Sequence, residues 1–191
     1  MDTRWIIVAT IGMAAGLALG QQADGHHAQA PHAAAAAANQ PAQPPIKPES
    51  WPWKKYFATG KALAPVTGLK PGDEAFEVRD SAKRVLGWVF RTDHVSPVIR
   101  GRNAEIGVMV ALGKDGKIVG VEVIENHETP AYFHRLTSAF YHQFVGHAVS
   151  APATDIDAVT GATISSDAVI RDVFESSAEL LKVVQPATPK A

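Results

Sequence analysis

Apolar residues dominate, and partly alternate with polar ones, along four short stretches in the middle of the chain. This pattern is typical of β-strands that bury one face more than the other. The stretches are 75–79 (AFEVR), 85–92 (VLGWVFRT), 104–112 (AEIGVMVAL) and 117–125 (KIVGVEVIE). We therefore expect at least four strands in this region.

The last two of these stretches show the clearest hairpin pattern. Strict alternation in the fourth stretch places Ile118, Gly120 and Glu122 on one face, and Val119, Val121 and Val123 on the other. The dipeptide Asp115-Gly116 separates the third stretch from the fourth, and Asp-Gly favours a tight turn between antiparallel strands. The sequence therefore predicts an antiparallel hairpin here.

Two later stretches place their apolar residues at helical spacing. The first is 131–145, in which the apolar positions are Phe133, Leu136, Phe140 and Phe144. The second is 165–184, with Asp167 expected in its first turn and an apolar stripe of Val169, Val173, Leu180 and Val184. Because helices follow a run of antiparallel strands, the expected fold class is α+β, an antiparallel sheet with packed helices.

The N-terminal part of the chain has a different composition from the rest. Sixteen uncharged residues, 5–20, follow Arg4, which is fewer than the ~20 apolar residues of a membrane span. This pattern predicts a secretory signal over 1–22, or alternatively an uncleaved N-terminal anchor. We therefore expect a periplasmic or extracytoplasmic protein, tethered to the membrane by its N-terminus if the anchor is retained.

Three further regions follow the predicted signal. Residues 23–50 are rich in Ala, Pro, Gln and His, and such a segment predicts a flexible linker. Aromatic residues first gather at Trp51, so the folded domain is expected over 51–185, with a tail over 186–191. A linker of this kind would separate the folded domain from a membrane or a partner.

Charge and composition exclude several classes of function. The chain has 18 basic and 19 acidic residues and no basic stripe, so no nucleic-acid partner is expected. It has no cysteine, which excludes disulfides, iron–sulfur clusters and covalent haem attachment. No G-x-S-x-G motif of a serine hydrolase is present. No metal site is expected at His94, His127, His134, His142 or His147, and His26, His27 and His32 indicate at most loose metal binding.

The stretch 157–166, DAVTGATISS, carries the candidate chemistry. Its hydroxyl residues precede the second predicted helix, and a simple interpretation is that they cap it, with Thr163 as the N-cap. The alternative is an anion site, because unpaired N–H groups at a helix N-terminus attract phosphate. Gly161 and Ala162 would leave room for a bulky group near the backbone. Residue types alone leave both interpretations open.

The string D-x-x-T-G-A-T over 157–163 resembles the flavinylation motif of the FMN-binding domain family. This family includes domains of the Na⁺-pumping NADH:quinone oxidoreductase (its C subunit), of Rnf complexes (the G subunit) and of the nitrous oxide reductase regulator NosR. The resemblance implies that a flavin transferase links the phosphate of FMN to Thr163 through a phosphoester. The surrounding cofactor-binding residues would be Asp157, Thr160, Gly161, Ala162, Ile164 and Ser165, with Ser166 as a further capping or phosphate-contact residue.

A second region, 94–133, resembles the hairpin and flavin-side loop of the same family. The family often continues E-T-P with G-L-G, whereas this chain reads ETPAYF. The resemblance therefore implies ring-side contacts from Glu128, Thr129 and Pro130, and we expect Tyr132 to stack on the ring or shield it. Without the resemblance, Glu128 to Pro130 would be a strand-end turn in which Pro130 opens a helix.

The stretch 91–101, RTDHVSPVIRG, resembles the NosR-type flavin domain in particular. The resemblance as a whole implies an electron-transfer carrier between redox partners, one of them a redox protein or a membrane respiratory complex. The alternative is a sensor or accessory module of a membrane redox system that performs no reaction of its own. For the carrier the cofactor would be covalent FMN, whereas the module would use either the flavin or only the fold, and no catalytic residue is assigned.

Overall fold

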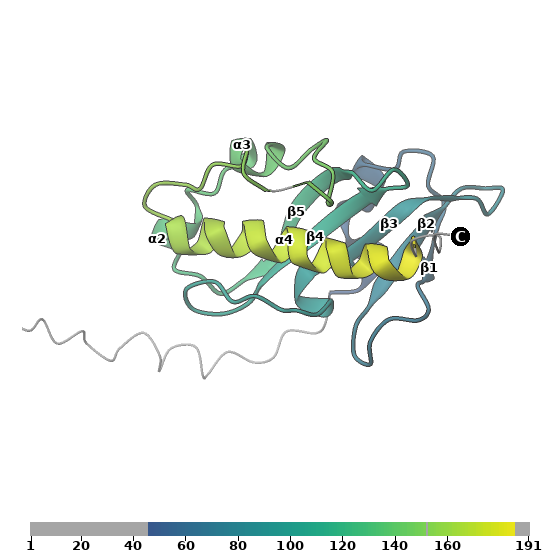
Figure 1. Cartoon of the computed structure of the whole chain (residues 1–191), viewed down its shortest axis with the longest axis horizontal. Helices are drawn as coiled ribbons and strands as arrows, with labels where there is room; N and C mark the ends of the chain where they lie inside the picture. The colour runs from purple at the N-terminus through teal and green to yellow at the C-terminus, as the bar shows by residue number, and fades with distance from the viewer. Residues whose placement is uncertain (1–45, 152, 186–191) are drawn as a thin grey trace, which may run out of the picture. The chain divides into compact units, whose positions relative to one another are not determined.

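The structure is a computed structural model that describes residues 46–151 and 153–185. Five strands form one antiparallel sheet in which each strand pairs with its neighbour along the chain, in the order β1-β2-β3-β4-β5 (Figure 1). The strands are β1 (Ala62–Pro65), β2 (Ala75–Arg79), β3 (Val85–Arg91), β4 (Ile106–Gly113) and β5 (Ile118–Asn126). The predicted α+β fold with an antiparallel sheet is confirmed.

In the part of the chain that the structure describes, the helices are few, and a single long one dominates. Three 3₁₀ turns are η1 (Pro48–Ser50), η2 (Pro52–Lys55) and η3 (Thr92–His94). The α-helices are α2 (Pro130–Phe133), α3 (Ser138–His142) and α4 (Thr163–Val184). Among the described residues, no helix is both long and apolar enough to span a bilayer. The predicted signal over 1–22, residues 23–45 of the predicted linker with its three histidines, and the tail over 186–191 lie outside the described residues.

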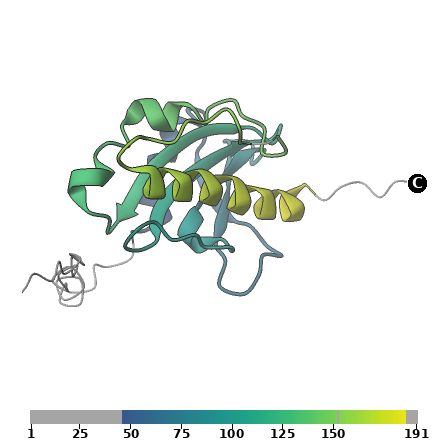
Figure 2. The same cartoon turned by 60° about the vertical axis from the view of Figure 1, so that its left-hand side comes forward.

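Each face of the sheet carries its own hydrophobic core. Helix α4 lies across one face (Figures 1 and 2), and its buried Val169, Val173 and Leu180 pack with Val108 and Val110 of β4. The opposite face packs against the N-terminal segment, because side chains alternate between the faces of a strand. That second core contains Trp51, Trp53, Phe57, Phe76, Val78, Val89, Met109 and Ala111.

The predicted alternation in the last strand is wrong at its beginning. Leu112 of β4 pairs with Ile118, but Ala111 pairs with Gly120, so Val119 is an extra residue at a β-bulge. Because the bulge resets the alternation, Ile118 and Val121 both pack into the core under α4, while Val119 packs into the opposite one. The predicted hairpin itself is confirmed, and its turn is closed by a hydrogen bond from Gly116 N to Gly113 O of 3.0 Å.

The single helix predicted over 131–145 is wrong, since α2 and α3 are separate short helices. The backbone at Thr137 is extended (ψ 175°), and this residue is the N-cap of α3. At the end of α2, the ring nitrogen Nδ1 of His134 lies 2.5 Å from the carbonyl oxygen of Pro130, the first residue of that helix. The apolar pattern nevertheless reports burial correctly. The side chains that face the core are those of Phe133, Leu136, Phe140 and Phe144.

Helix α4 begins at Thr163, two residues before the predicted start. Ala162, with φ −135°, is therefore the N-cap, and the expectation that Thr163 caps the helix is wrong. Asp167 is likewise beyond the first turn. The N-terminal end of α4 lies at the end of the sheet where the chain leaves β5 and forms α2 (Figures 1 and 2). The two regions of candidate chemistry thus come together.

Candidate functional site

The turn that leads into α4 is held by its own hydrogen bonds. Gly161 has φ +82°, a left-handed conformation that favours glycine. Ser166 Oγ accepts a hydrogen bond from Val159 N at 3.0 Å and can donate to the carbonyl of Ala162 or Thr163, each 3.1 Å away. Ser166 therefore ties the turn to the first residues of α4, but no side chain accepts a hydrogen bond from the N–H groups that begin this helix.

The four hydroxyl groups of this turn differ sharply in their surroundings. Ser165 and Ser166 are buried, and both hydroxyls are engaged in hydrogen bonds. Thr160 and Thr163 are exposed, but Thr163 lines a pocket of about 230 Å³ and Thr160 does not. Thr163 is therefore the hydroxyl that a bound group in this pocket can reach.

The pocket collects most of the residues singled out from the sequence. From the turn and the start of α4 it takes residues 161–165, and from α2 it takes Tyr132. Tyr132 is 44% exposed and Ile164 is 56% exposed, two of the four large hydrophobic side chains that are exposed in the described part of the chain. A pocket with exposed apolar walls beside a free hydroxyl suits a ligand that has a flat apolar ring system and a polar tail.

Glu128 lies behind the pocket instead of in it. Its side chain is buried, and its carboxylate accepts hydrogen bonds from Ser165 Oγ at 2.5 Å, Asn103 N at 2.7 Å and Arg102 N at 3.1 Å. Burial raises the pKa of this carboxyl, but the hydrogen bonds from Ser165 and the backbone N–H groups outweigh burial and lower the pKa below its usual value. The charged Glu128 therefore joins the 101–104 loop to the first turn of α4.

The other predicted residues lie around the pocket without lining it. Thr129 is exposed and its Oγ1 accepts a hydrogen bond from Asn103 Nδ2 at 3.1 Å. Pro130 is the first residue of α2, as the strand-end alternative expected. Asp157 is exposed, and its backbone N–H donates to Gln143 Oε1 at 2.9 Å. These three residues shape the loops that surround the pocket.

Two arginines of the site were missed by the sequence reasoning. Arg102 lines the pocket, and its guanidinium lies 5.5 Å from the centre of the Tyr132 ring. Arg135 lies against Gly161, because a Cβ placed on Gly161 would be 3.0 Å from Arg135 Nη1. The room that Gly161 was expected to leave for a bulky group is thus partly occupied by this guanidinium. In the sequence, the two basic residues of Arg100-Gly101-Arg102 are the feature that could have indicated Arg102.

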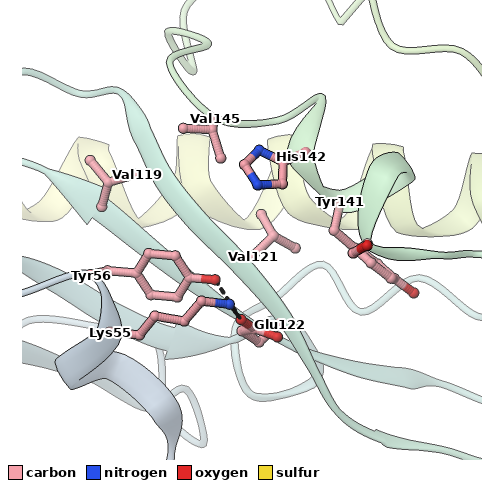
Figure 3. Close-up of a pocket in the computed structure, with 9 residues that line it drawn as sticks. Lys55, Tyr56, Val119, Val121, Glu122, Tyr141, His142 and Val145 are labelled. Atoms are coloured by element: carbon pink, nitrogen blue, oxygen red, sulfur yellow. Dashed lines mark hydrogen bonds and ion pairs between the residues drawn. The ribbon is translucent and has the colours of Figure 1, made fainter.

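A second pocket, of about 260 Å³, lies beside the edge strand β5 (Figure 3). Lys55 Nζ and Tyr56 Oη converge there on Glu122, with 2.6 Å between Tyr56 Oη and Glu122 Oε1. Burial and the hydrogen bond to Glu122 raise the pKa of Tyr56 to about 12. This network attaches the N-terminal segment to β5, and none of the predicted site residues takes part. In residues 46–151 and 153–185, no three His, Asp or Glu side chains cluster as metal ligands would.

Comparison with known proteins agrees with this geometry. Residues 101–175 match the family model of the FMN-binding domain. One relative is the G subunit of the Na(+)-translocating ferredoxin:NAD(+) oxidoreductase complex of Acetobacterium woodii. It is 27% identical over an alignment of 124 residues, and the match covers 58% of this chain and 58% of the relative. Another is the G subunit of the ion-translocating oxidoreductase complex of Methanosarcina acetivorans. It is 29% identical over an alignment of 142 residues, and the match covers 66% of this chain and 71% of the relative. This chain thus spans less than two thirds of the first relative's length.

The residues present fit FMN, since Tyr132 and Ile164 offer apolar surface for a ring, and Arg102 and the N-terminus of α4 offer positive charge for a phosphate. The motif over 157–163 and all the residues that line the pocket lie within the matched region 101–175. The match over residues 101–175 and the residues that line the pocket therefore agree on FMN as the cofactor.

Proposed function

We propose that the chain carries FMN joined through a phosphoester to Thr163 and serves as an extracytoplasmic electron-transfer carrier. The observation that carries this proposal is the contrast between the hydroxyls of the motif. Thr163 is exposed and lines the pocket, whereas Ser165 and Ser166 are buried and hydrogen-bonded. The position of Thr163 in the pocket supports its role as the acceptor that the D-x-x-T-G-A-T motif implies.

The attachment requires a flavin donor whose phosphate is already activated. Thr163 Oγ attacks phosphorus, an Oγ–P bond forms, and the hydroxyl proton leaves to solvent or to a base of the transferase. The bond that breaks joins the flavin phosphate to its leaving group, which is a nucleoside monophosphate if the donor is a flavin dinucleotide. Positive charge at the helix N-terminus favours the anionic phosphate in this step.

Once FMN is attached, this chain's own residues bind and orient it. FMN supplies one- and two-electron redox chemistry that protein side chains lack. Tyr132 and Ile164 give the ring an apolar surface, and the buried Glu128 holds the 101–104 loop against α4 so that the pocket keeps its shape. A covalent link would also prevent loss of the cofactor outside the cytoplasm.

Intact mass of the mature protein, made together with a flavin transferase, tests the attachment. We expect a mass increase of one FMN less one water, and a yellow protein that keeps its colour after acid precipitation. The Thr163→Ala variant should show no such increase, while Thr154→Ala, which removes an exposed loop hydroxyl, should be labelled like the parent. Attachment that persists in Thr163→Ala would contradict the proposal. The same spectrum reports whether residues 1–22 are removed.

The proposed partners follow from the relatives and from the chain's termini. The two relatives are subunits of ion-translocating oxidoreductase complexes, which supports a membrane redox partner for this chain. The uncharged run over 5–20 supports export, either with a cleaved signal or with a membrane tether. We propose that a flavin transferase matures the protein there and that electrons then pass between the flavin and a redox partner.

A second candidate function rests on the stretch 91–101, whose resemblance to the NosR-type flavin domain favours an accessory or sensory module. A module of that kind uses the fold, with or without the flavin, and does not need rapid turnover of electrons. Reversible reduction of the bound flavin with fast exchange in a redox titration supports the carrier, and a flavin that exchanges electrons slowly supports the module.

A further inference from the structure

Arg102 lines the pocket beside Thr163, and Arg135 lies against Gly161 of the same motif. Both guanidinium groups belong to exposed residues, and among the carboxylates of residues 46–151 and 153–185, none lies within 4.0 Å of Arg102 or Arg135. Other exposed arginines of the domain are paired, for example Arg171 with Glu175 at 3.2 Å and Arg100 with Glu105 at 3.5 Å. The positive charge at this site therefore remains available to an anion.

The position of Arg102 is fixed by its neighbours on two sides. Its backbone N–H donates to Glu128 Oε2 at 3.1 Å, and its guanidinium stacks near the Tyr132 ring at 5.5 Å. Since Glu128 also binds Ser165, the loop that bears Arg102 is tied to the first turn of α4. An arginine held in this way loses less entropy when it binds a phosphate than a freely rotating one does.

Arg135 lies against the glycine of the motif. Its guanidinium occupies the space that a side chain at Gly161 would fill, with Nη1 at 3.0 Å and Cζ at 3.2 Å from that Cβ position. Gly161 is two residues before Thr163, in the turn whose backbone leads into α4. The glycine of the motif thus allows a cation to lie on the backbone next to the acceptor.

We propose that Arg102 and Arg135 form a phosphate clamp that recognises the flavin by its phosphate before attachment and neutralises the phosphodiester afterwards. This inference rests on the proposed function, because it places the flavin phosphate at Thr163. Guanidinium groups suit this role because their planar donors match phosphate oxygens and they stay charged at every physiological pH. Tyr132 then acts as a support for Arg102 as well as a wall of the pocket.

Binding of two free flavins by the Thr163→Ala variant of the full chain tests the clamp. FMN carries a phosphate of about −2 charge near neutral pH, and riboflavin lacks it. Quenching of flavin fluorescence gives both dissociation constants without any covalent step. We expect FMN to bind more tightly than riboflavin by roughly tenfold, equivalent to about 1.4 kcal/mol. Added salt should weaken FMN binding and leave riboflavin binding largely unchanged.

Arginine variants in the same background complete the test. Arg102→Gln and Arg135→Gln should each reduce the preference for FMN, and the double variant should abolish it. Arg171→Gln is the matched control, since it removes an exposed arginine of α4 that is paired with Glu175. Equal affinity for the two flavins, no binding of either, or a preference unchanged in the double variant would overturn the clamp. Failure of the proposed function would appear separately, as parent protein without FMN in the mass spectrum.

Discussion

Glu128 shows how one buried charge organises the pocket beside Thr163. It was singled out as a ring-side contact, but the structure places it behind the pocket, where Ser165 and the backbone N–H groups of Arg102 and Asn103 donate to its carboxylate. A buried carboxylate is tolerated when several donors satisfy it. Glu128 thus determines how the loop that carries Arg102 meets α4, and its loss would disturb the pocket without removing a pocket residue.

The Glu128→Gln variant should be less stable than the parent by about 1–3 kcal/mol, because an amide cannot accept the same set of charge-assisted hydrogen bonds. The folded pKa of Glu128 is lowered, so its charge contributes stability fully above its ordinary pKa of 4.5. That contribution is lost as the pH falls through the lowered folded pKa. Urea unfolding at pH 7 and at decreasing acid pH measures both effects.

The matched control for this prediction is Glu105→Gln, an exposed residue close to the same loop. Surface pairs of this kind contribute roughly 0–1 kcal/mol, so the control should unfold much like the parent. If the stability difference between parent and Glu128→Gln stays constant down to the most acidic pH, the charge of Glu128 does not hold the loop.

At the residue scale, the sequence identified the motif but not its surroundings. Residues 161–165 form one wall of the pocket because they are contiguous, and a motif of consecutive residues can be recognised without a structure. Arg102 reaches the pocket from the 101–104 loop, and Arg135 reaches Gly161 from the segment between α2 and α3. Such contacts depend on tertiary packing, which no local pattern in the sequence records.

At the element scale, the sequence predicted which residues are buried better than where elements begin. Four strands and α4 lie close to the predicted stretches, whereas β1 and the break between α2 and α3 were missed. Strand β1 is four residues long, is partly exposed and ends in Pro65, so it carries little apolar pattern. The break at Thr137 leaves the apolar spacing intact, so the spacing alone does not reveal it.

Next to the bulge in β5, Gly120 is the strand residue that packs against Tyr56. The Tyr56 ring lies directly on Gly120, so that an added Cβ would overlap the ring. Gly120→Ala should therefore destabilise the domain by about 1–3 kcal/mol, as overpacking does. In a Tyr56→Ala background the methyl group meets no ring, and the same substitution should cost little.

A double-mutant cycle from thermal or urea unfolding measures this coupling between Tyr56 and Gly120. The coupling energy should be comparable in size with the cost of Gly120→Ala alone. Equal destabilisation of the parent and of Tyr56→Ala by the alanine would show that strand conformation, and not contact with the ring, determines the need for glycine.

For the molecule as a whole, the region that matches the FMN-binding domain is shorter than the part of the chain that forms the sheet and its two cores. The match covers 101–175, but β1, β2 and β3 precede it and complete the sheet. Residues 46–57 also precede it and cover the sheet face opposite α4. Trp51 and Trp53 are both 3% exposed, and Trp51 Nε1 donates to Ile46 O at 3.2 Å. The flavin site therefore depends on residues far outside the motif-bearing region.

Removal of residues 46–57 should consequently unfold the domain although it removes no site residue. Deletion would expose Phe76, Val89 and Met109, which are now buried beneath this segment. Truncation of a buried tryptophan typically costs about 3–5 kcal/mol, a large share of the roughly 5–15 kcal/mol stability of a small domain. In the full chain, Trp51→Ala and Trp53→Ala should therefore each lower the melting temperature markedly, and Pro52→Ala, an exposed neighbour, should lower it little. A fragment over 58–185 that melts cooperatively like the full chain would show that the second core is dispensable and that the flavin domain folds from the sheet and α4 alone.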